Sequence, residues 1–164
     1  MKTLYLIRHA KSDWSIDGLS DIDRPLNKKG YNDAHKMSLI LKEKNVVPDL
    51  IISSPAVRAI STSLIFCRIF EYNPKSILIN KNLYDTSVKE YVQAISKIDA
   101  EHQVVLLFGH NPSISSTFSA LTNFTNQEIP TCGIVGIQSN ITNWGDFSKK
   151  SNTLIYLDFP KNHL

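Results

Sequence analysis

The chain has 164 residues, of which 42% are hydrophobic and 20% are charged, so it can bury a core and is not intrinsically disordered. Its 18 Lys and Arg against 15 Asp and Glu give a formal charge of +3, which favours an anionic ligand but is too small to indicate nucleic-acid binding. No apolar run approaches the ~20 residues of a membrane span, and residues 1–7 are too short for a signal peptide. We expect one cytoplasmic domain over residues 1–164, with no nucleic-acid or membrane partner and an oligomeric state left open.

Short apolar runs alternate with longer segments of helical periodicity. The runs predict strands at Leu4–Ile7, Leu50–Ile52, Ser76–Ile79, Val104–Phe108, Ile134–Ile137 and Thr153–Phe159. The periodic segments predict helices at about Lys28–Glu43, Ala56–Phe70 and Lys89–Ile98, and from Ser113 onward. The unbroken apolar run 104–108 is typical of a central strand covered on both faces. This alternation predicts an α/β fold, a three-layer α/β/α sandwich with a mainly parallel central sheet.

Two helix starts carry sequence signals, and the periodicity predicts which helix residues face inward. Asn27 can cap the helix that begins at Lys28, and Pro55 suits the first turn of the next helix. The apolar spacing places Tyr31 and Leu64 on the buried sides of these two helices.

The cysteines and glycines give no sign of a cofactor. Cys67 and Cys132 have no CxxC spacing and no nearby histidine pair, so we expect buried free thiols rather than a zinc or redox site. No GxGxxG follows a predicted strand, which argues against a dinucleotide-binding enzyme. The sequence therefore predicts neither a metal nor an organic cofactor.

Cationic side chains follow three of the predicted strands. Arg8 and His9 come directly after the first strand. Arg58 lies shortly after the second, and His110 follows the central strand. Because ligands of such folds bind beyond the carboxyl ends of the strands, we expect these four side chains to meet at one edge of the sheet.

Two arginines and two histidines in one place suit a phosphoryl group. Guanidinium groups match phosphate oxygens with paired donors, and helix N-termini after Pro55 and Pro112 add backbone donors. A neutral imidazole can attack phosphorus, and nearby cations disfavour its protonation. A second imidazole can donate to an oxygen as charge develops. From spacing alone, ordinary solvated strand-to-helix turns remain the alternative.

Four stretches carry a family resemblance in their order along the chain: residues 6–14 (LIRHAKSDW), 23–30 (DRPLNKKG), 53–59 (SSPAVRA) and 108–112 (FGHNP). Together they resemble the histidine phosphatase superfamily, also called the phosphoglycerate mutase-like family, and within it the SixA-like phosphohistidine phosphatases. Each motif alone is weak, but the ordered set is highly specific. The resemblance implies a phosphoglycerate mutase-like fold over residues 1–164.

The same resemblance implies roles for the clustered residues. His9 would be the nucleophile that becomes phosphorylated, with a backbone carbonyl fixing its tautomer. Arg8 and Arg58 would hold the phosphoryl oxygens, and His110 would complete the pocket. Asn111 would either lend its backbone N–H to the phosphate or only cap the following helix. No metal is implied, because these groups stand where a metal ion would otherwise neutralise charge.

Several positions depart from the wider family. The third residue of the Arg-His motif is Ala10 rather than Gly, as in the SixA-like group. Lys11 and Ser15 stand where mutases have Glu and Asn, which argues against a phosphoglycerate mutase. Ester-cleaving members also carry a glutamate proton donor on an insertion, but the connection 80–103 is short here. The nearest carboxylates within it are Asp85 and Glu90. Asp85 is the better candidate for the proton donor, and the alternative is that it is an ordinary surface-loop residue.

These departures favour protein phosphohistidine as the substrate. Its P–N bond is activated once the imidazole nitrogen is protonated, so solvent can supply the proton, whereas an alkyl ester needs a positioned acid. A short connection also predicts an open site that suits a phosphorylated side chain, although a loop at 19–24 could cover it. A phosphatase for a small phosphate ester and a phosphoprotein-binding module without catalysis remain alternatives.

Overall fold

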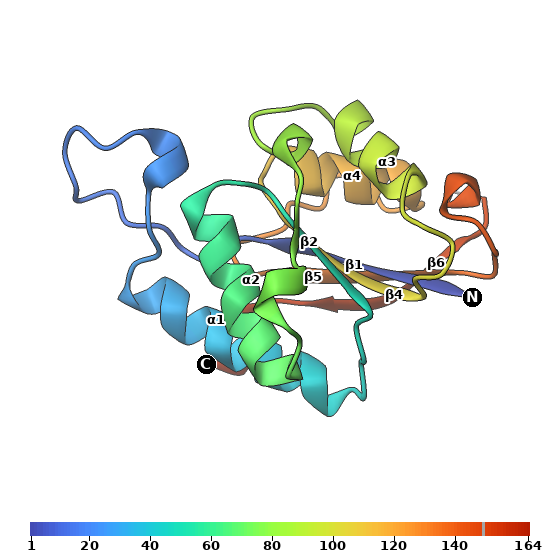
Figure 1. Cartoon of the computed structure of the whole chain (residues 1–164), viewed down its shortest axis with the longest axis horizontal. Coiled ribbons are helices and arrows are strands. Elements are labelled where there is room, and N and C mark those ends of the chain that lie inside the picture. Colours follow the sequence, from blue (N-terminus) through green and yellow to red (C-terminus); the bar gives the residue numbers. More distant parts are fainter. Residues whose placement is uncertain (149) are drawn as a thin grey trace.

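A mainly parallel sheet forms the centre of the molecule. The computed structural model describes residues 1–148 and 150–164, so Lys149, within the predicted loop 140–151, lies outside the described residues. The strands of the sheet follow the order β3-β2-β4-β1-β5-β6 (Figure 1). Their bounds are β1 Lys2–Arg8, β2 Leu50–Ser53, β3 Leu78–Ile79, β4 Val104–Gly109, β5 Ile134–Ser139 and β6 Asn152–Asp158. Neighbours from β3 to β1 pair in parallel, and β5 is antiparallel to both β1 and β6.

Helices cover both faces of this sheet. Their bounds are α1 Lys28–Glu43, α2 Val57–Phe70, α3 Val88–Ser96 and α4 Ser113–Leu121. Helices α1 and α2 lie on one face, and α3 and α4 lie on the other (Figure 1). The predicted α/β class, with three layers and a mainly parallel sheet, is confirmed. Within the described part of the chain, no helix has the length and apolar character needed to cross a membrane.

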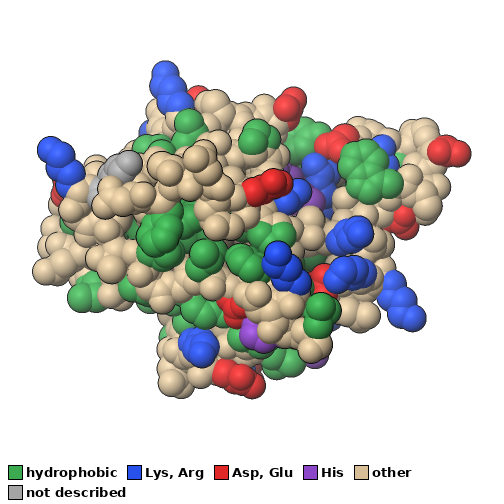
Figure 2. All heavy atoms as spheres, turned by 180° about the vertical axis from the view of Figure 1, so that it is seen from behind, with side chains coloured by type: hydrophobic (Ala, Val, Ile, Leu, Met, Phe, Trp, Pro, Cys, Tyr) green, Lys and Arg blue, Asp and Glu red, His purple; other side chains and the backbone are tan. Residues whose placement is uncertain are grey.

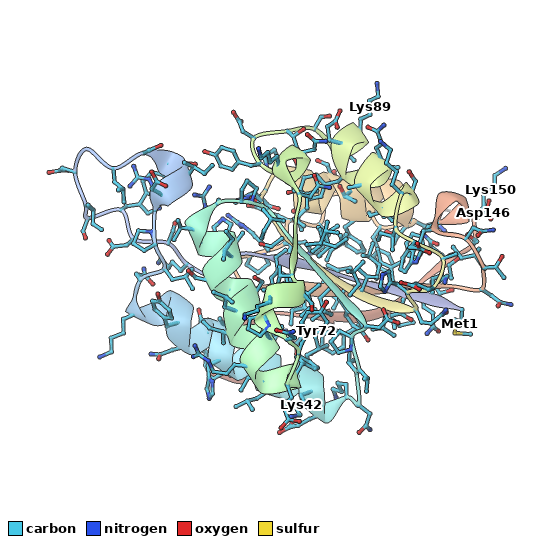
Figure 3. The ribbon with its side chains drawn as sticks, viewed as in Figure 1. Met1, Lys42, Tyr72, Lys89, Asp146 and Lys150 are labelled. Atoms are coloured by element: carbon cyan, nitrogen blue, oxygen red, sulfur yellow. The ribbon has the colours of Figure 1, made fainter. Side chains whose placement is uncertain are left out.

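The central strands bury residues toward both helix layers. On β4, Leu106 and Phe108 pack with Met37 and other residues of the α1–α2 side, whereas Leu107 packs on the α3–α4 side with Tyr91. Side chains from the helices fill the space against the sheet (Figure 3). An unbroken apolar run is therefore required here, because successive residues point to opposite and equally dry faces.

The predicted third strand is wrong in its first half. Ser76 ends a short 3₁₀ turn, Pro74–Ser76, and only Leu78–Ile79 pairs with β2. The turn forms because the Asn73 side chain accepts a hydrogen bond from the Lys75 N–H at 3.0 Å, which bends the backbone away from an extended course.

Two predicted inward-facing residues point outward. Tyr31 and Leu64 are 49% and 37% exposed. On α2, Thr62 and Ser63 are fully buried instead. The buried face is thus partly polar, because Thr62 bonds to the segment after β1. Apolar periodicity in the sequence cannot identify a helix face that is buried through the hydrogen bonds of polar side chains.

The segment between β1 and α1 forms a lobe that projects from the layers (Figure 1). Two contacts hold its base: the Asn27 N–H donates to the Lys11 carbonyl at 3.0 Å, and the Asn27 side chain accepts from the Gly30 N–H at 2.8 Å. The predicted cap at Asn27 is confirmed. A Cβ at position 30 would collide with the Lys11 carbonyl, so only glycine lets the helix approach the lobe this closely.

Candidate active site

The carboxyl ends of β1 and β4 place two imidazoles side by side. Arg8 and Gly109 are partners in the parallel ladder, so the residues that follow them leave the sheet together. The His9 N–H donates to the Gly109 carbonyl at 3.0 Å, and the His9 and His110 ring centroids lie 5.0 Å apart. Arg58, from the first turn of α2, places its Nε 3.3 Å from His9 Nε2. Of the four side chains predicted to meet, the structure brings together His9, Arg58 and His110.

His9 is held with one defined nitrogen available for chemistry. Its Nδ1 lies 2.7 Å from the Ala10 carbonyl, and since a carbonyl only accepts, Nδ1 carries the proton. Burial, together with the charges of Arg58 and Arg8, lowers the pKa of His9 to about 4. The ring is therefore neutral near pH 7, with the lone pair of Nε2 facing Arg58. The sequence predicted a backbone acceptor for His9 and a lowering of its pKa by nearby cations. In the structure, burial is a larger cause of the lowered pKa than the cations are.

His110 is fixed from two sides. Its Nε2 lies 2.7 Å from Ser54 Oγ, and its backbone N–H donates to the Tyr91 hydroxyl at 3.1 Å. Ser54 Oγ accepts from the Ala56 N–H, and its own proton has no other acceptor in the described structure, so we assign that proton to His110 Nε2 and the imidazole proton to Nδ1. Burial, followed by the proximity of His9 and then of the Arg58 charge, lowers the pKa of His110 to about 3. This neutral imidazole is a hydrogen-bond donor without a positive charge.

Two buried donors at the site have no hydrogen-bond partner among the described residues. They are His110 Nδ1 and Arg8 Nε. Arg8 Nη1 donates to the Ile129 carbonyl at 2.9 Å, and Arg8 lines a separate hollow of about 440 Å³ together with Glu128 and Lys161. Buried donors without partners are costly, and an anion that reached either of them would satisfy it.

A cavity of about 350 Å³ opens beside these groups, and we call it the site cavity. Its lining residues are Asp21, Arg58, Tyr84, Asp85, His110 and Asn111. Asp85 therefore reaches the site, and its role as a proton donor stays a prediction. The Asn111 side chain donates to the Ile129 carbonyl at 2.9 Å and accepts from Ser115 Oγ at 2.8 Å. Asn111 thus bonds to Ser115 in the first turn of α4, whose N-cap residue is Pro112, and its phosphate contact stays a prediction.

Two residues of the site were missed from the sequence. Asp21, in the short helical turn Asp21–Asp23 of the lobe, accepts from Arg58 Nη2 at 3.0 Å through Oδ2 and from Arg58 Nη1 at 2.6 Å through its carbonyl. The Tyr84 hydroxyl donates to the same Oδ2 at 2.7 Å. The loop expected at 19–24 does reach the site, but no periodic pattern links position 21 to position 84.

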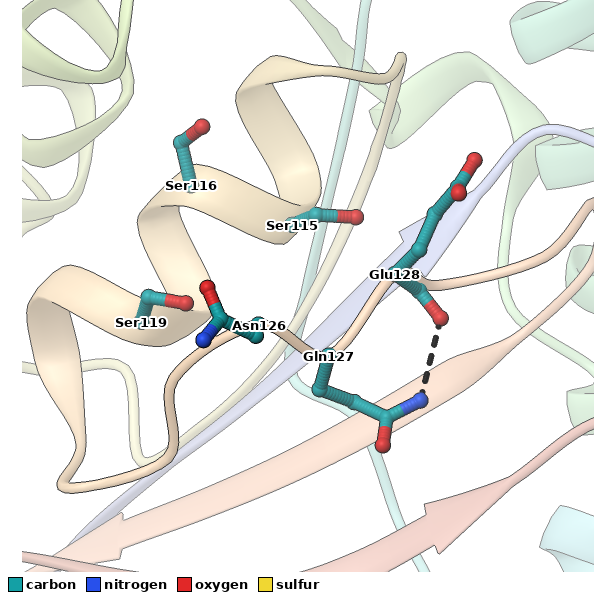
Figure 4. A pocket seen from close by; sticks show the side chains of 6 residues that line it. All are labelled: Ser115, Ser116, Ser119, Asn126, Gln127 and Glu128. Atoms are coloured by element: carbon teal, nitrogen blue, oxygen red, sulfur yellow. Dashed lines mark hydrogen bonds between the residues drawn. The ribbon is translucent and has the colours of Figure 1, made fainter.

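The surface around the site is mixed in charge. Histidine atoms and Lys or Arg atoms lie next to each other beside the projecting lobe in Figure 2. A larger hollow of about 560 Å³ lies between α4 and residues 126–128 (Figure 4). Its lining residues, all within the described chain, are Ser115, Ser116, Ser119, Asn126, Gln127 and Glu128, with no cation among them. This hollow does not suit a phosphoryl group.

Neither thiol is among the residues that line the site cavity. Cys67 and Cys132 are free and buried, as predicted, and burial raises the pKa of the Cys67 thiol to about 11. Across residues 1–148 and 150–164, no group of three or more His, Cys, Asp or Glu side chains is arranged to hold a metal ion.

Comparison with known proteins adds a family match and several similar chains. The model of the histidine phosphatase superfamily (branch 1) matches residues 4–91. An uncharacterized chloroplastic protein of Arabidopsis thaliana is 29% identical over 151 residues, 87% of this chain and 69% of that protein. The crystal structure of a candidate phosphohistidine phosphatase SixA from Agrobacterium tumefaciens has a TM-score of 0.81 and 27% identity, over 96% of this chain and 97% of that one. The protein histidine phosphatase SixA with tungstate has a TM-score of 0.84 at 20% identity, over 98% of each chain, which is a similarity of fold.

Proposed function

Because the chain belongs to the histidine phosphatase superfamily, we propose that it is a phosphatase that transfers the phosphoryl group of protein phosphohistidine to His9 and then to water. One observation carries the proposal. The proton of His9 is fixed on Nδ1 by the Ala10 carbonyl, so the lone pair is on Nε2, where it accepts from Arg58 Nε at 3.3 Å and is freed for attack when Arg58 turns to the phosphoryl group. A neutral imidazole held in this way is a preorganised nucleophile for phosphorus.

The first step is an in-line displacement. The lone pair of His9 Nε2 forms a bond to phosphorus while the P–N bond of the substrate breaks. The electron pair of that bond returns to the substrate imidazole nitrogen. The second ring nitrogen of that imidazole gains its proton from solvent before the bond breaks, so a neutral ring leaves. The phosphorylated His9 ring then carries a positive charge, which the Ala10 carbonyl stabilises through Nδ1–H.

The second step returns the enzyme to its starting state. A water oxygen attacks phosphorus from the side that the substrate ring has left, and the bond to Nε2 breaks. Its electron pair returns to His9, and the proton of the water goes to solvent with the released phosphate. His110 and the two arginines keep their places through both steps, because both transition states carry charge on the same equatorial oxygens.

Charge on those oxygens is neutralised by side chains in this mechanism. Arg58 supplies paired donors, and Arg8 Nε and His110 Nδ1 are the buried donors that lack partners in the described structure. Arginine suits phosphate because its planar fork donates two parallel hydrogen bonds. We therefore expect turnover to be unchanged by a metal chelator.

Phosphohistidine fits the site better than a metabolite for two reasons. The residue proposed as a proton donor, Asp85, belongs to a short connection, and a P–N bond can be cleaved without a positioned acid. The site cavity of about 350 Å³ is bordered by half-exposed Asp21, so a side chain projecting from another protein can enter it. The similar Agrobacterium tumefaciens protein is also named for phosphohistidine.

The test uses His9→Ala and a matched control, His35→Ala, whose side chain is exposed on α1. With a radiolabelled histidine-phosphorylated protein, the unmodified enzyme and His35→Ala should release phosphate and show a transient acid-labile label. His9→Ala should do neither. A label that persists in His9→Ala would assign the nucleophile to another residue.

A second measurement separates the candidate substrates. We expect kcat/KM for a histidine-phosphorylated protein to exceed that for sugar and nucleotide phosphates. Faster, saturable hydrolysis of a small ester would replace the protein substrate with a metabolite. Tight phosphate binding without turnover of any substrate would indicate a binding module.

A further inference from the structure

Two carboxyl side chains, Asp21 and Asp85, line the site cavity beside the phosphoryl donors. Once Arg58 and His110 contact the phosphoryl group, the remaining lining residues are Asp21, Tyr84, Asp85 and Asn111. Two of these four carry a negative charge, and none carries a positive charge. The leaving group lies in line with the nucleophile through phosphorus, and these residues border the cavity through which we expect it to enter.

Asp21 is the better fixed of the two carboxylates. Its Oδ2 accepts hydrogen bonds from the Tyr84 hydroxyl at 2.7 Å and from Arg58 Nη2 at 3.0 Å. These bonds lower the pKa of Asp21, with Tyr84 the larger cause, so the carboxyl is ionised at neutral pH. Arg24 Nε, 3.6 Å from Oδ1, offsets part of this charge, while the Arg24 guanidinium stacks on the Trp14 ring at 4.0 Å.

Asp21 occupies two donors of Arg58 in the structure, one with its carboxylate and one with its backbone carbonyl. Arg58 Nη1 and Nη2 both bond to Asp21, and Nε bonds to His9 Nε2. A phosphoryl group that binds the two Nη atoms of Arg58 as a fork competes with Asp21 for these donors. The displaced carboxylate stays attached to Tyr84 and so remains beside the leaving group.

We propose that Asp21 is a specificity-determining residue that favours substrates with a neutral or cationic leaving group over those with an anionic one. This inference rests on the proposed function, since it concerns the leaving-group side of the same site. A phosphohistidine ring is protonated when its P–N bond breaks, so a fixed carboxylate attracts it. A leaving group that bears a carboxylate is repelled by the same charge.

The experiment uses two phenyl phosphates of equal length, one with an ammonium tail and one with a carboxylate tail. Both have the same kind of phenol as leaving group, so the ratio of their kcat/KM values reports the charge of the tail alone. The ratio, ammonium over carboxylate, should exceed one for the unmodified chain. In Asp21→Asn it should fall by about fivefold, as expected for a half-exposed charge a few ångströms from the tail.

Asp23→Asn is the matched control, because Asp23 is an exposed carboxylate in the same short turn as Asp21. It changes the net charge by the same amount and should leave the ratio unchanged. Tyr84→Phe gives a second route that does not alter Asp21 itself. It removes the hydroxyl that fixes the carboxylate but keeps the ring against His110, at 5.6 Å between centroids, and should lower the ratio by a smaller factor.

The outcomes separate this inference from the proposed function. If the unmodified chain hydrolyses both phenyl phosphates through labelled His9 with equal kcat/KM, the phosphatase stands and the role of Asp21 is rejected. Equal falls in Asp21→Asn and Asp23→Asn would also reject it, since they would reflect net charge only. If neither substrate is hydrolysed and His9 is never labelled, the proposed function itself fails.

Discussion

The site has two walls that are built in different ways. The inner wall, His9, Arg58 and His110, rises from strand ends and the first turn of α2, and each residue is at most 8% exposed. The outer wall, Asp21, Tyr84 and Asp85, comes from loops, and the Asp21 side chain is 48% exposed. The inner wall is held by buried hydrogen bonds to backbone and hydroxyl groups. This difference suggests that the inner wall sets the chemistry and the outer wall selects the substrate.

Removing a cation from the inner wall should have the largest effect. We expect Arg58→Ala to lower kcat/KM for a phosphorylated substrate by about 10²–10³-fold, the loss typical of a donor that stabilises transition-state charge. Arg58→Lys should recover only part of it, because an ammonium group keeps the charge without the paired donors. Steady-state kinetics on both variants measure the difference, with Arg68→Ala, on the exposed side of α2, as a control.

Full activity in Arg58→Ala would contradict the assignment of catalysis to the inner wall and of substrate selection to the outer wall. It would mean that Arg58 serves only to hold Asp21, with which it shares two hydrogen bonds. In that case Asp21→Asn should destabilise the lobe as much as the arginine variant does, and thermal unfolding would show it.

The buried imidazoles of the inner wall should make stability depend on pH. Burial lowers the pKa of His9 to about 4 and that of His110 to about 3, against about 6.5 for an unfolded histidine. The unfolded chain therefore binds protons at these positions between about pH 6.5 and pH 4, where the folded chain does not. Stability is full above pH 6.5 and falls as the pH drops toward 4, by roughly 3 kcal/mol for each histidine at most.

Urea unfolding at pH 7.5 and at pH 4.5 measures this loss. His110→Gln removes one titrating group, so its stability should change less between the two pH values than that of the unmodified chain. His35→Gln, at an exposed position, should behave like the unmodified chain. Equal pH dependence in all three would show that His110 is solvated and does not form part of a buried wall.

The two walls also differ in how far the sequence predicted them. The inner wall follows from apolar runs that end in cationic residues, because parallel strands bring their carboxyl ends together. The capping signal at Asn27 likewise gave the start of α1. The contact between Asp21 and Tyr84 joins two irregular segments 63 positions apart, and no local pattern encodes such a meeting. Thr62, buried because it accepts from the Ala10 N–H, was missed for a similar reason, since it breaks the apolar face of α2.

The smallest expected effect concerns Asp85 of the outer wall. Its φ of 48° lies in the left-handed region, which Asn tolerates well, so Asp85→Asn removes the acid without straining the backbone. As a proton donor to a leaving oxygen, Asp85 would matter for an alkyl phosphate and hardly for a P–N bond. We expect turnover of a histidine-phosphorylated protein to change by less than about threefold, and ester hydrolysis to fall by a larger factor. An equal fall in turnover for both substrates would place Asp85 in phosphoryl binding. Unchanged ester hydrolysis would show that Asp85 is not the proton donor and that solvent protonates either leaving group.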